Sequence, residues 1–553
     1  MTSHVPGGVP TAYQDTFAHD RLPPADALPH FDFSGTPELA AYSDHMNIAT
    51  ELLDNALQQG FGDNAVLHLG DVSWTYNELL DRANRIAETL TLDCGLVTGN
   101  RVLIRAPNTP MAVAAWFGVL KAGGICVTTM PLLRARELQY VIEKANVSIA
   151  LCDADLAEEM VGALELTDSI GSTLYFSKAG SGGEAATMET ACDSKSGTFS
   201  NINTAADDVA LIAFTSGTTG QPKGAMHFHR DILATADTFG RYVGKFTPDD
   251  IVTGTPPLAF TFGLGGVTIF PMRFGASTRF LESPFPEHIL ETIQKYKITQ
   301  IYTAPTAYRA MADMVKDYDI SSLRQGVSAG ETLPKATWEA FHQATGIRLI
   351  DGLGSTELFH IFVAASPEEM RPGFTGKAIP GFKARVVDDG GDEVPPGTPG
   401  LLAVQGPTGC KYIDDLDRQP IYVRDGWNYP GDVYEMDEDG YFKYIARADD
   451  MIISSGYNIS GPEVEAILLE HEAVAECAVI ASPDPDRGNI VKAFIVLKEG
   501  FTGSDDLVKA LQDFVKNEIA PYKYPRAISF IDELPKTQTG KLQRYRLRDQ
   551  ETG

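Results

Sequence analysis

Segments typical of strands and segments typical of helices alternate along this chain from Met46 to about residue 365. Short apolar runs predict strands, and apolar residues spaced three or four apart predict helices. The predicted helices are 47–59, one beginning near 76, 111–122, 137–145 and 286–296; the predicted strands are 65–69, 72–75, 101–105, 125–127, 149–152, 209–214, 300–303, 326–330 and 348–350. Such alternation predicts an α/β fold with parallel, or mostly parallel, sheets covered by helices.

Changes in sequence character divide the 553 residues, which are too many for a single hydrophobic core. Residues 1–45 lack periodicity and predict an irregular arm. The Gly/Ser/Ala-rich stretch 178–200 predicts a loop. Short strands and turns at about 373–444 predict a β-rich subdomain. Helices 462–470 and 505–518 and strands 477–481 and 493–497 follow, so we expect a large domain over 1–448 and a small α+β domain over 449–553.

The composition limits the classes of partner. A formal net charge of -29 argues against nucleic acid and anionic membrane surfaces, since both require clustered Lys and Arg. The six cysteines show no C-x-x-C spacing, which argues against a zinc site or a disulfide framework. The first residues, MTSHVPGGVPTAYQD, lack the apolar core of a secretory signal. We therefore expect a cytoplasmic protein.

One uncharged run, Ile251 to Met272, is long enough in principle to cross a bilayer. It is interrupted by Pro256, Pro257 and Pro271 and by four glycines. We therefore predict no integral membrane segment and interpret the run as buried chain that lines a cavity.

The loop TSGTTGQPKG, Thr215 to Gly224, follows the predicted strand 209–214. Its glycines allow backbone N–H groups to turn toward an anion, and its hydroxyls and lysine can donate to phosphate oxygens. The donors and glycines are Thr215, Ser216, Gly217, Thr218, Thr219, Gly220 and Lys223. It is not a Walker loop, because Pro222 precedes the lysine and Gly224 follows it. The alternative is a solvated surface loop; composition favours a phosphate site.

A second motif, Asp351-Gly-Leu-Gly-Ser-Thr-Glu357, imitates the start of a dinucleotide fingerprint. Glu357 occupies the position of the third glycine, which weakens that interpretation. A carboxylate beside the hydroxyl of Thr356 suits Mg²⁺ held between protein oxygen and phosphate. A helix-capping glutamate is the alternative.

These motifs carry a resemblance. The loop at Thr215 is similar to the signature loop of the acyl-adenylate-forming superfamily, which includes acyl-CoA ligases, luciferases and the adenylation domains of peptide synthetases. Further segments resemble motifs of this family and occur in the same order. Ser328–Pro334 resembles the adenine-side turn, Thr356-Glu357 resembles the pair of residues that binds the metal, and Gly431-Asp432 resembles the motif with the ribose-binding aspartate. Arg447–Asp450 and Gly456–Ser460 resemble the hinge, and Pro535–Lys541 resembles the closing lysine loop. The resemblance implies a small mobile C-terminal domain.

It also implies substrates and residue roles. The family forms an acyl-AMP from a carboxylate and ATP with Mg²⁺, and then transfers the acyl group to CoA. Lys541, Glu357 and Thr356 would be catalytic, with Glu357 binding the metal and Asp449 acting as hinge. Besides the loop residues above, the implied ATP and CoA contacts are Ser328, Ala329, Gly330, Glu331, Asp351, Gly352, Asp432, Arg447 and Gly456. Leu353 stands where many members have a tyrosine, and Phe260 where many have a histidine.

The D-G-x-G-S-T-E motif followed by His360-Ile361 resembles the aryl-CoA ligase branch, the benzoate and 2-aminobenzoate ligases. The residues predicted to line the acyl pocket are Thr261, Phe262, Gly263, Ala329, Gly330, His360 and Ile361. A flat ring suits such a pocket, with His360 donating to the carboxylate and Thr261 bonding an ortho substituent. The alternatives are that Phe262 is a core residue and His360 a satisfied buried histidine.

Three other functions stay open at this point. They are a medium-chain acyl-CoA synthetase, an adenylation module that charges a carrier protein, and a regulatory protein that binds ATP as a switch. A carrier-charging module for amino acids usually places a carboxylate against the substrate ammonium, and the run Ile251 to Met272 has none. A homodimer is compatible with the sequence, which does not define the oligomeric state.

Overall fold

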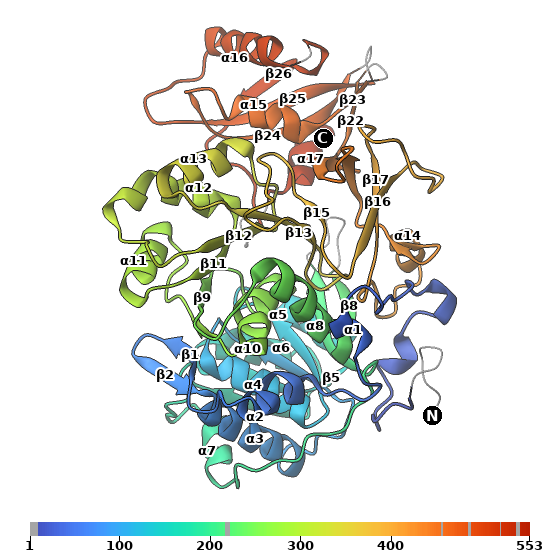
Figure 1. Ribbon diagram of the computed structural model, residues 1–553, viewed down its shortest axis with the longest axis vertical. Helices are drawn as coiled ribbons and strands as arrows, with labels where there is room; N and C mark the ends of the chain where they lie inside the picture. The colour runs from blue at the N-terminus through green and yellow to red at the C-terminus, as the bar shows by residue number, and fades with distance from the viewer. Residues whose placement is uncertain are drawn as a thin grey trace.

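The computed structural model describes residues 9–215, 222–448, 450–454, 457–484, 488–519, 521–537 and 542–552. Two helix-covered sheets are stacked along the long axis of the molecule, a β-rich sheet lies beside the second of them, and the C-terminal domain lies at the far end (Figure 1). This is the mixed α/β architecture that the alternating sequence predicts.

The first sheet has six strands, parallel except for its last pair. In spatial order they are β6 (Ser172–Phe176), β5 (Val147–Asp153), β3 (Arg101–Arg105), β4 (Ile125–Thr129), β7 (Val209–Thr215) and β8 (Lys223–Phe228). Its helices are α3 (Tyr76–Leu92), α4 (Pro110–Lys121), α5 (Ala135–Lys144), α6 (Ala157–Leu164), α7 (Thr187–Asp193) and α8 (His229–Thr235). Helix α3 begins with a capping box between Thr75 and Glu78, as Ser/Thr-x-x-Glu spacing predicts.

The second sheet has nine strands, with a parallel centre and antiparallel edges. In spatial order they are β15 (Lys377–Ala378), β14 (Ile361–Ala364), β13 (Ile350–Gly354), β12 (Gln325–Ala329), β11 (Gln300–Thr303), β9 (Ile251–Gly254), β10 (Ser277–Arg279), β1 (Ala65–Leu69) and β2 (Val72–Thr75). Helices α11 (Pro286–Tyr296), α12 (Pro305–Met314) and α13 (Lys335–Thr345) share a hydrophobic core with one side of it.

The uncharged run forms strand β9, the short helix α9 (Thr261–Leu264), a π-helical turn and most of the short helix α10 (Phe270–Arg273). It is largely buried, and Leu258, Ala259, Leu264 and Thr268 line a cavity of about 20 Å³ together with Trp116. The expected buried, cavity-lining chain is therefore present. No helix in the described part of the chain is long and apolar enough to cross a membrane.

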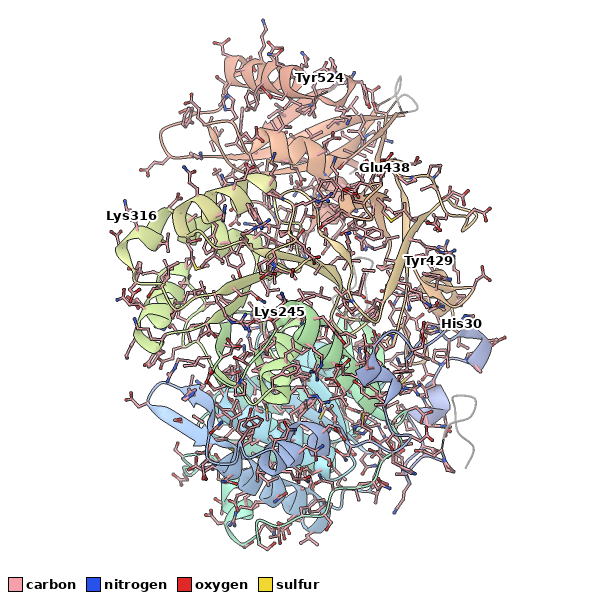
Figure 2. All side chains as sticks on the ribbon, viewed as in Figure 1. His30, Lys245, Lys316, Tyr429, Glu438 and Tyr524 are labelled. Atoms are coloured by element: carbon pink, nitrogen blue, oxygen red, sulfur yellow. The ribbon has the colours of Figure 1, made fainter. Side chains whose placement is uncertain are left out.

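The β-rich sheet is antiparallel. It consists of β16 (Lys383–Val387), β17 (Gly400–Gln405), β18 (Val423–Arg424), β19 (Trp427–Asn428), β20 (Asp432–Met436) and β21 (Phe442–Arg447), with the short helix α14 (Gln419–Tyr422) at its edge. The arm crosses to this sheet: the N–H of His30 donates to the carbonyl of Gly426 at 2.9 Å. Figure 2 shows the labelled His30 and Tyr429 on the same side of the molecule.

In the part of the C-terminal domain that the structure describes, there are a three-stranded sheet, a small hairpin and three α-helices. The elements are β22 (Ile452–Ser454), β23 (Tyr457–Ile459), β24 (Val474–Asp484), β25 (Gly488–Leu497), β26 (Ala527–Phe530), α15 (Gly461–Leu468), α16 (Asp505–Glu518) and α17 (Arg544–Thr552). It has hydrophobic clusters of its own, centred on Val464, Val479 and Val515 and on Ile480 and Leu547.

Three local predictions need correction. The stretch 178–200 contains helix α7, whose Met188 and Cys192 are buried in the core against α3; this tertiary burial overrides the loop-like composition. The strand predicted at 348–350 runs instead over Ile350–Gly354, because pairing with β12 decides its extent. The helix predicted at 47–59 contains a π-helical stretch at Thr50–Asp54 and ends in the short helix α2 (Asn55–Gln58). The other short helix, α1 (Pro37–Ala40), lies in the arm.

Candidate active site

The ends of the glycine-rich loop are fixed by strand pairing. β7 ends at Thr215 and β8 begins at Lys223, and these two residues face each other in an antiparallel ladder. The loop is therefore a hairpin connection at the edge of the first sheet. Ser216, Gly217, Thr218, Thr219 and Gly220 lie outside the described residues. The Nζ of Lys223 lies 5.5 Å from the centroid of the Tyr412 ring, within cation–π range.

Glu357 and Thr356 lie in the turn that follows β13. The Glu357 side chain is largely buried, with 9% exposed, and its Oε1 accepts a 2.5 Å hydrogen bond from the hydroxyl of Tyr412. Within the described ranges, Tyr412 is its one hydrogen-bond donor, and no group of three or more His, Cys, Asp or Glu is placed to hold a metal. A lone carboxylate fits Mg²⁺, which keeps waters and takes phosphate oxygens as its remaining ligands.

The same turn is contacted by a second tyrosine. Tyr422 and Ser355 share a 2.9 Å hydrogen bond between hydroxyls, and the ring of Tyr422 lies edge-on to that of Tyr412 at 5.9 Å. Sequence reasoning missed both tyrosines. The stretch that contains Tyr412, GPTGCKY, has no spacing that marks it as functional; only the fold brings it to Glu357.

Strand pairing also joins the predicted adenine-side residues. Ser328 and Ala329, at the end of β12, lie beside Asp351 and Gly352 of β13. Gly330 follows with φ +89°, a left-handed conformation that favours glycine; Glu331 is half-buried. Removal from water raises the pKa of Asp351 to about 7, although Thr375 donates to its carboxylate.

Asp432 and Arg447 are joined in the β-rich sheet. They face each other across β20 and β21, and the Arg447 Nη1 lies 3.3 Å from the Asp432 Oδ1 and donates to the carbonyl of Pro430 at 2.6 Å. Gly431 has φ +85°, and a Cβ there would lie 2.8 Å from the arginine Nη2. The predicted ribose aspartate is thus held by the predicted hinge arginine.

The His360 side chain packs against Phe262, which was predicted to line the acyl pocket, and against Phe239 and Phe270, which were not. Its ring lies 4.5, 5.4 and 5.5 Å from the rings of Phe270, Phe239 and Phe262. The ring is almost fully buried, and burial lowers its pKa to about 3, so it is neutral at physiological pH. Thr261 is buried at the start of α9, and Ile361 packs beside Gly352.

The hydrogen bonding of His360 differs from the sequence expectation that it donates to a carboxylate. Its Nε2 lies 3.3 Å from the carbonyl oxygen of Phe262. A carbonyl only accepts, so the Nε2 of this neutral ring carries the proton and donates. The buried Nδ1 has no hydrogen-bond partner in the described structure, and in this tautomer it is an acceptor.

Three predicted residues, Lys541, Asp449 and Gly456, lie outside the described residues. The next residue after the predicted hinge, Asp450, is described. It accepts a hydrogen bond from Arg548 of α17, and Arg544 of the same helix bonds Glu465 of α15 at 2.7 Å. The first described residue of the small domain is therefore tied to the last helix of that domain.

The chain is similar to known proteins along most of its length. Residues 54–411 match the AMP-binding enzyme family, and residues 463–541 match the AMP-binding enzyme C-terminal domain. The chain is 33% identical over 523 residues to a benzoate–CoA ligase of Thauera aromatica, covering 94% of this chain and 98% of that protein. It is 34% identical over 495 residues to the mitochondrial acyl-coenzyme A synthetase ACSM3 of Homo sapiens, covering 87% and 84%.

A solved structure is similar throughout. The crystal structure of the anthranilate CoA ligase AuaEII in complex with anthranoyl-AMP superposes with a TM-score of 0.87 at 32% identity, covering 93% of this chain and 98% of that one. Three findings assign the chain to one family: the family models match, the sequence identity extends over almost the whole chain, and the fold is shared. The chain belongs to the AMP-binding enzyme family, as an AMP-forming acid–thiol ligase that uses ATP, Mg²⁺ and CoA.

Proposed function

We propose that the acid is aromatic, of the size of benzoate, and that 2-aminobenzoate or a close relative is favoured. The observation that carries the proposal is the surroundings of His360, a neutral imidazole enclosed by three phenylalanine rings. Aromatic walls with one convergent polar atom suit a flat ring better than a flexible chain. The benzoate and anthranilate ligases among the similar proteins support the same choice.

The ortho substituent follows from the tautomer of His360. Because Nε2 donates to the Phe262 carbonyl, the unpartnered Nδ1 needs a donor. An ortho amino or hydroxyl group supplies one, whereas a carboxylate does not. His360 would thus recognise the substituent, and Thr261 remains available to either group.

The remaining roles follow the chemistry of adenylation. The β- and γ-phosphates would be held by the residues of the glycine-rich loop, namely Thr215, Ser216, Gly217, Thr218, Thr219, Gly220 and Lys223. The adenine side of ATP would be held by Ser328, Ala329, Gly330, Glu331, Asp351 and Gly352. Glu357 with Thr356 would hold Mg²⁺, which neutralises phosphate charge. Lys541 would lie at the α-phosphate, where negative charge accumulates as the carboxylate oxygen forms its bond to phosphorus and pyrophosphate departs.

Asp432 and Arg447 would hold the ribose in both steps. In the second step the CoA sulfur bonds the acyl carbon and AMP leaves as the acyl–oxygen bond breaks. We propose that a large domain of residues 1–448 and a small domain of 449–553 rearrange between steps at Asp449, and that Gly456 then lies beside the pantetheine arm.

All six cysteines are free thiols, which suits action in the reducing cytoplasm.

An aliphatic acid is the second candidate, because the chain is also 34% identical to acyl-coenzyme A synthetase ACSM3, over 87% of its length. The test compares kcat/KM for benzoate, 2-aminobenzoate, 4-hydroxybenzoate, hexanoate and palmitate. Preference for either aliphatic acid refutes the aromatic proposal. Preference for benzoate over 2-aminobenzoate refutes the assignment of the ortho substituent alone.

The reaction itself is measured in two assays. Carboxylate-dependent exchange of pyrophosphate into ATP reports adenylation, and thioester formation with free CoA reports transfer. Exchange without a CoA thioester would identify a module that charges a carrier protein. ATP binding without exchange would identify a regulatory protein.

A further inference from the structure

The segment that carries Tyr412 is bound to the first sheet as an additional short strand. Ala225 and Tyr412 form an antiparallel bridge. The N–H of Met226 donates to the carbonyl of Lys411 at 2.8 Å, and the N–H of Ile413 donates to the carbonyl of Gly224 at 2.9 Å. The backbone of Tyr412 is therefore fixed to β8, the strand that follows the phosphate loop.

The side chain of Tyr412 is equally constrained. It is 1% exposed, and its backbone N–H also donates to the side chain of Gln419 at 3.0 Å. Its hydroxyl reaches Glu357 and its ring lies below Lys223. In this pair only the phenol O–H can donate, because an ionised carboxylate only accepts, so Tyr412 is the donor. A 2.5 Å O–H···O distance is typical of a donor facing a carboxylate.

We propose that Tyr412 is a positioning residue for the metal-binding carboxylate: its hydroxyl occupies Oε1 of Glu357 and so presents the other carboxylate oxygen to Mg²⁺. The inference rests on the proposed role of Glu357. A glutamate in a turn has free side-chain torsions, and a donor anchored on a separate strand removes that freedom. Partners that hold a metal ligand in this way commonly change metal affinity by about 10–100-fold when removed.

The contact also couples two parts of the triphosphate site. Glu357 follows β13 in the second sheet, whereas Lys223 begins β8 in the first. Tyr412 touches both, at the hydroxyl and at the ring face. The same side chain thereby sets the distance between the carboxylate and the lysine.

Tyr422 offers a matched control. It is a neighbouring buried tyrosine whose hydroxyl also bonds the turn, but through Ser355 rather than through the carboxylate. Tyr422→Phe removes one hydroxyl from the same aromatic pair and leaves the Tyr412–Glu357 bond in place. A purely structural role predicts equal effects of Tyr412→Phe and Tyr422→Phe.

The experiment measures the Kd of Mn²⁺, in the presence of a non-hydrolysable ATP analogue, by electron paramagnetic resonance on the full-length protein. We expect Tyr412→Phe to weaken Mn²⁺ about tenfold, equivalent to about 1.4 kcal/mol, and Tyr422→Phe to change it less than about twofold. Tyr412→Met, which fills the site without a hydroxyl, should weaken Mn²⁺ to the same extent and replaces the phenylalanine variant if that one does not fold. Wild-type affinity in both Tyr412 variants, or equal weakening in Tyr422→Phe, overturns the proposal.

A double-mutant comparison isolates the contact. In a Glu357→Gln background, Tyr412→Phe should have little further effect on Mn²⁺ affinity, because the partner of the hydroxyl is no longer a charged metal ligand. Undiminished weakening in that background overturns the proposal. Its failure is distinguishable from that of the proposed function: Mn²⁺ binding tests Tyr412 without any acid, whereas the pyrophosphate exchange of the wild type tests adenylation.

Discussion

The ammonium Nζ of Lys411 lies 2.7 Å from Oδ2 of Asp231, and both side chains are fully excluded from solvent. The ammonium also donates to the carbonyl of Gly409 at 2.9 Å. Burial lowers the pKa of Lys411, and the charge of Asp231 opposes that shift. The pair joins helix α8 to the segment that precedes Tyr412, so it fixes that segment against the helix.

Removing one partner of this pair should be costly. Lys411→Met leaves the Asp231 carboxylate buried without its cation, and we expect a loss of about 3–5 kcal/mol in the free energy of unfolding, measured in urea. Asp231→Asn in the Lys411→Met background removes the charge and keeps an acceptor for the N–H of Phe228. This double variant should recover most of the loss; a double variant no more stable than Lys411→Met would contradict the explanation.

Asp351 should make stability depend on pH. Its folded pKa of about 7 lies above the ordinary value of 3.8. Between these values the folded state keeps a proton that the unfolded state has released, so this group's contribution falls as pH rises from about 4 to about 7. Asp351→Asn should therefore be more stable than the wild type near pH 8, by up to about 4 kcal/mol, and about equal to it near pH 4.

Urea unfolding across that pH range measures the effect, with the exposed Asp249→Asn as control. A stability difference that is the same at both ends of the range would show that Asp351 does not titrate as described.

Gly265 should control the acyl pocket. A Cβ at this position would lie 2.4 Å from Cδ2 and 2.9 Å from Nε2 of His360, so Gly265→Ala must displace the ring from the Phe262 carbonyl. Overpacking of this kind costs about 1–3 kcal/mol, and we expect kcat/KM for aromatic acids to fall about 10–100-fold. Gly171→Ala, where the nearest atom would be 3.8 Å away, is the control. An unchanged kcat/KM in Gly265→Ala would show that His360 does not contact the acid substrate.

Lys541 should act in one half-reaction. Lys541→Ala is expected to slow formation of the acyl-AMP about 100-fold or more, as loss of a preorganised charge does, and to leave thioester formation from synthetic acyl-AMP largely intact. Single-turnover assays of each step measure both. Lys536→Ala, in the same segment but paired with Glu476, should affect neither; equal loss in both steps of Lys541→Ala would exclude a step-specific lysine.

Asp449 should be needed for the change between steps. Proline fixes φ near one value, so Asp449→Pro should spare either adenylation or thioester formation but not both. Asp449→Ala, which keeps backbone freedom, serves as control and should retain both. Equal activity of the proline variant in the two assays would mean that Asp449 is a surface residue rather than a hinge.

Local pattern predicted many elements at or near their observed limits. The strands 65–69, 72–75, 101–105 and 300–303 and the helices 286–296 and 505–518 agree with the structure residue for residue, because their periodicity and caps act over a few neighbouring positions. Helix α7 was not predicted from the sequence, because its burial against α3 is a tertiary effect. The ordered motifs likewise indicated Thr215, Glu357 and Asp432 as site residues, but not what holds them.

By itself the sequence determined the α/β alternation and the family, and it indicated the short segments that we propose carry the chemistry, because these depend on local periodicity and on residue types at fixed spacings. The tertiary structure alone decided the partners. Besides its hairpin partner β2, β1 pairs with β10, which lies about 200 residues later in the chain, whereas β3 belongs to the first sheet. Lys411 meets Asp231 across 180 positions, and Tyr412 meets Glu357 across 55. Contacts between distant segments depend on how the sheets pack, and no local pattern encodes that packing.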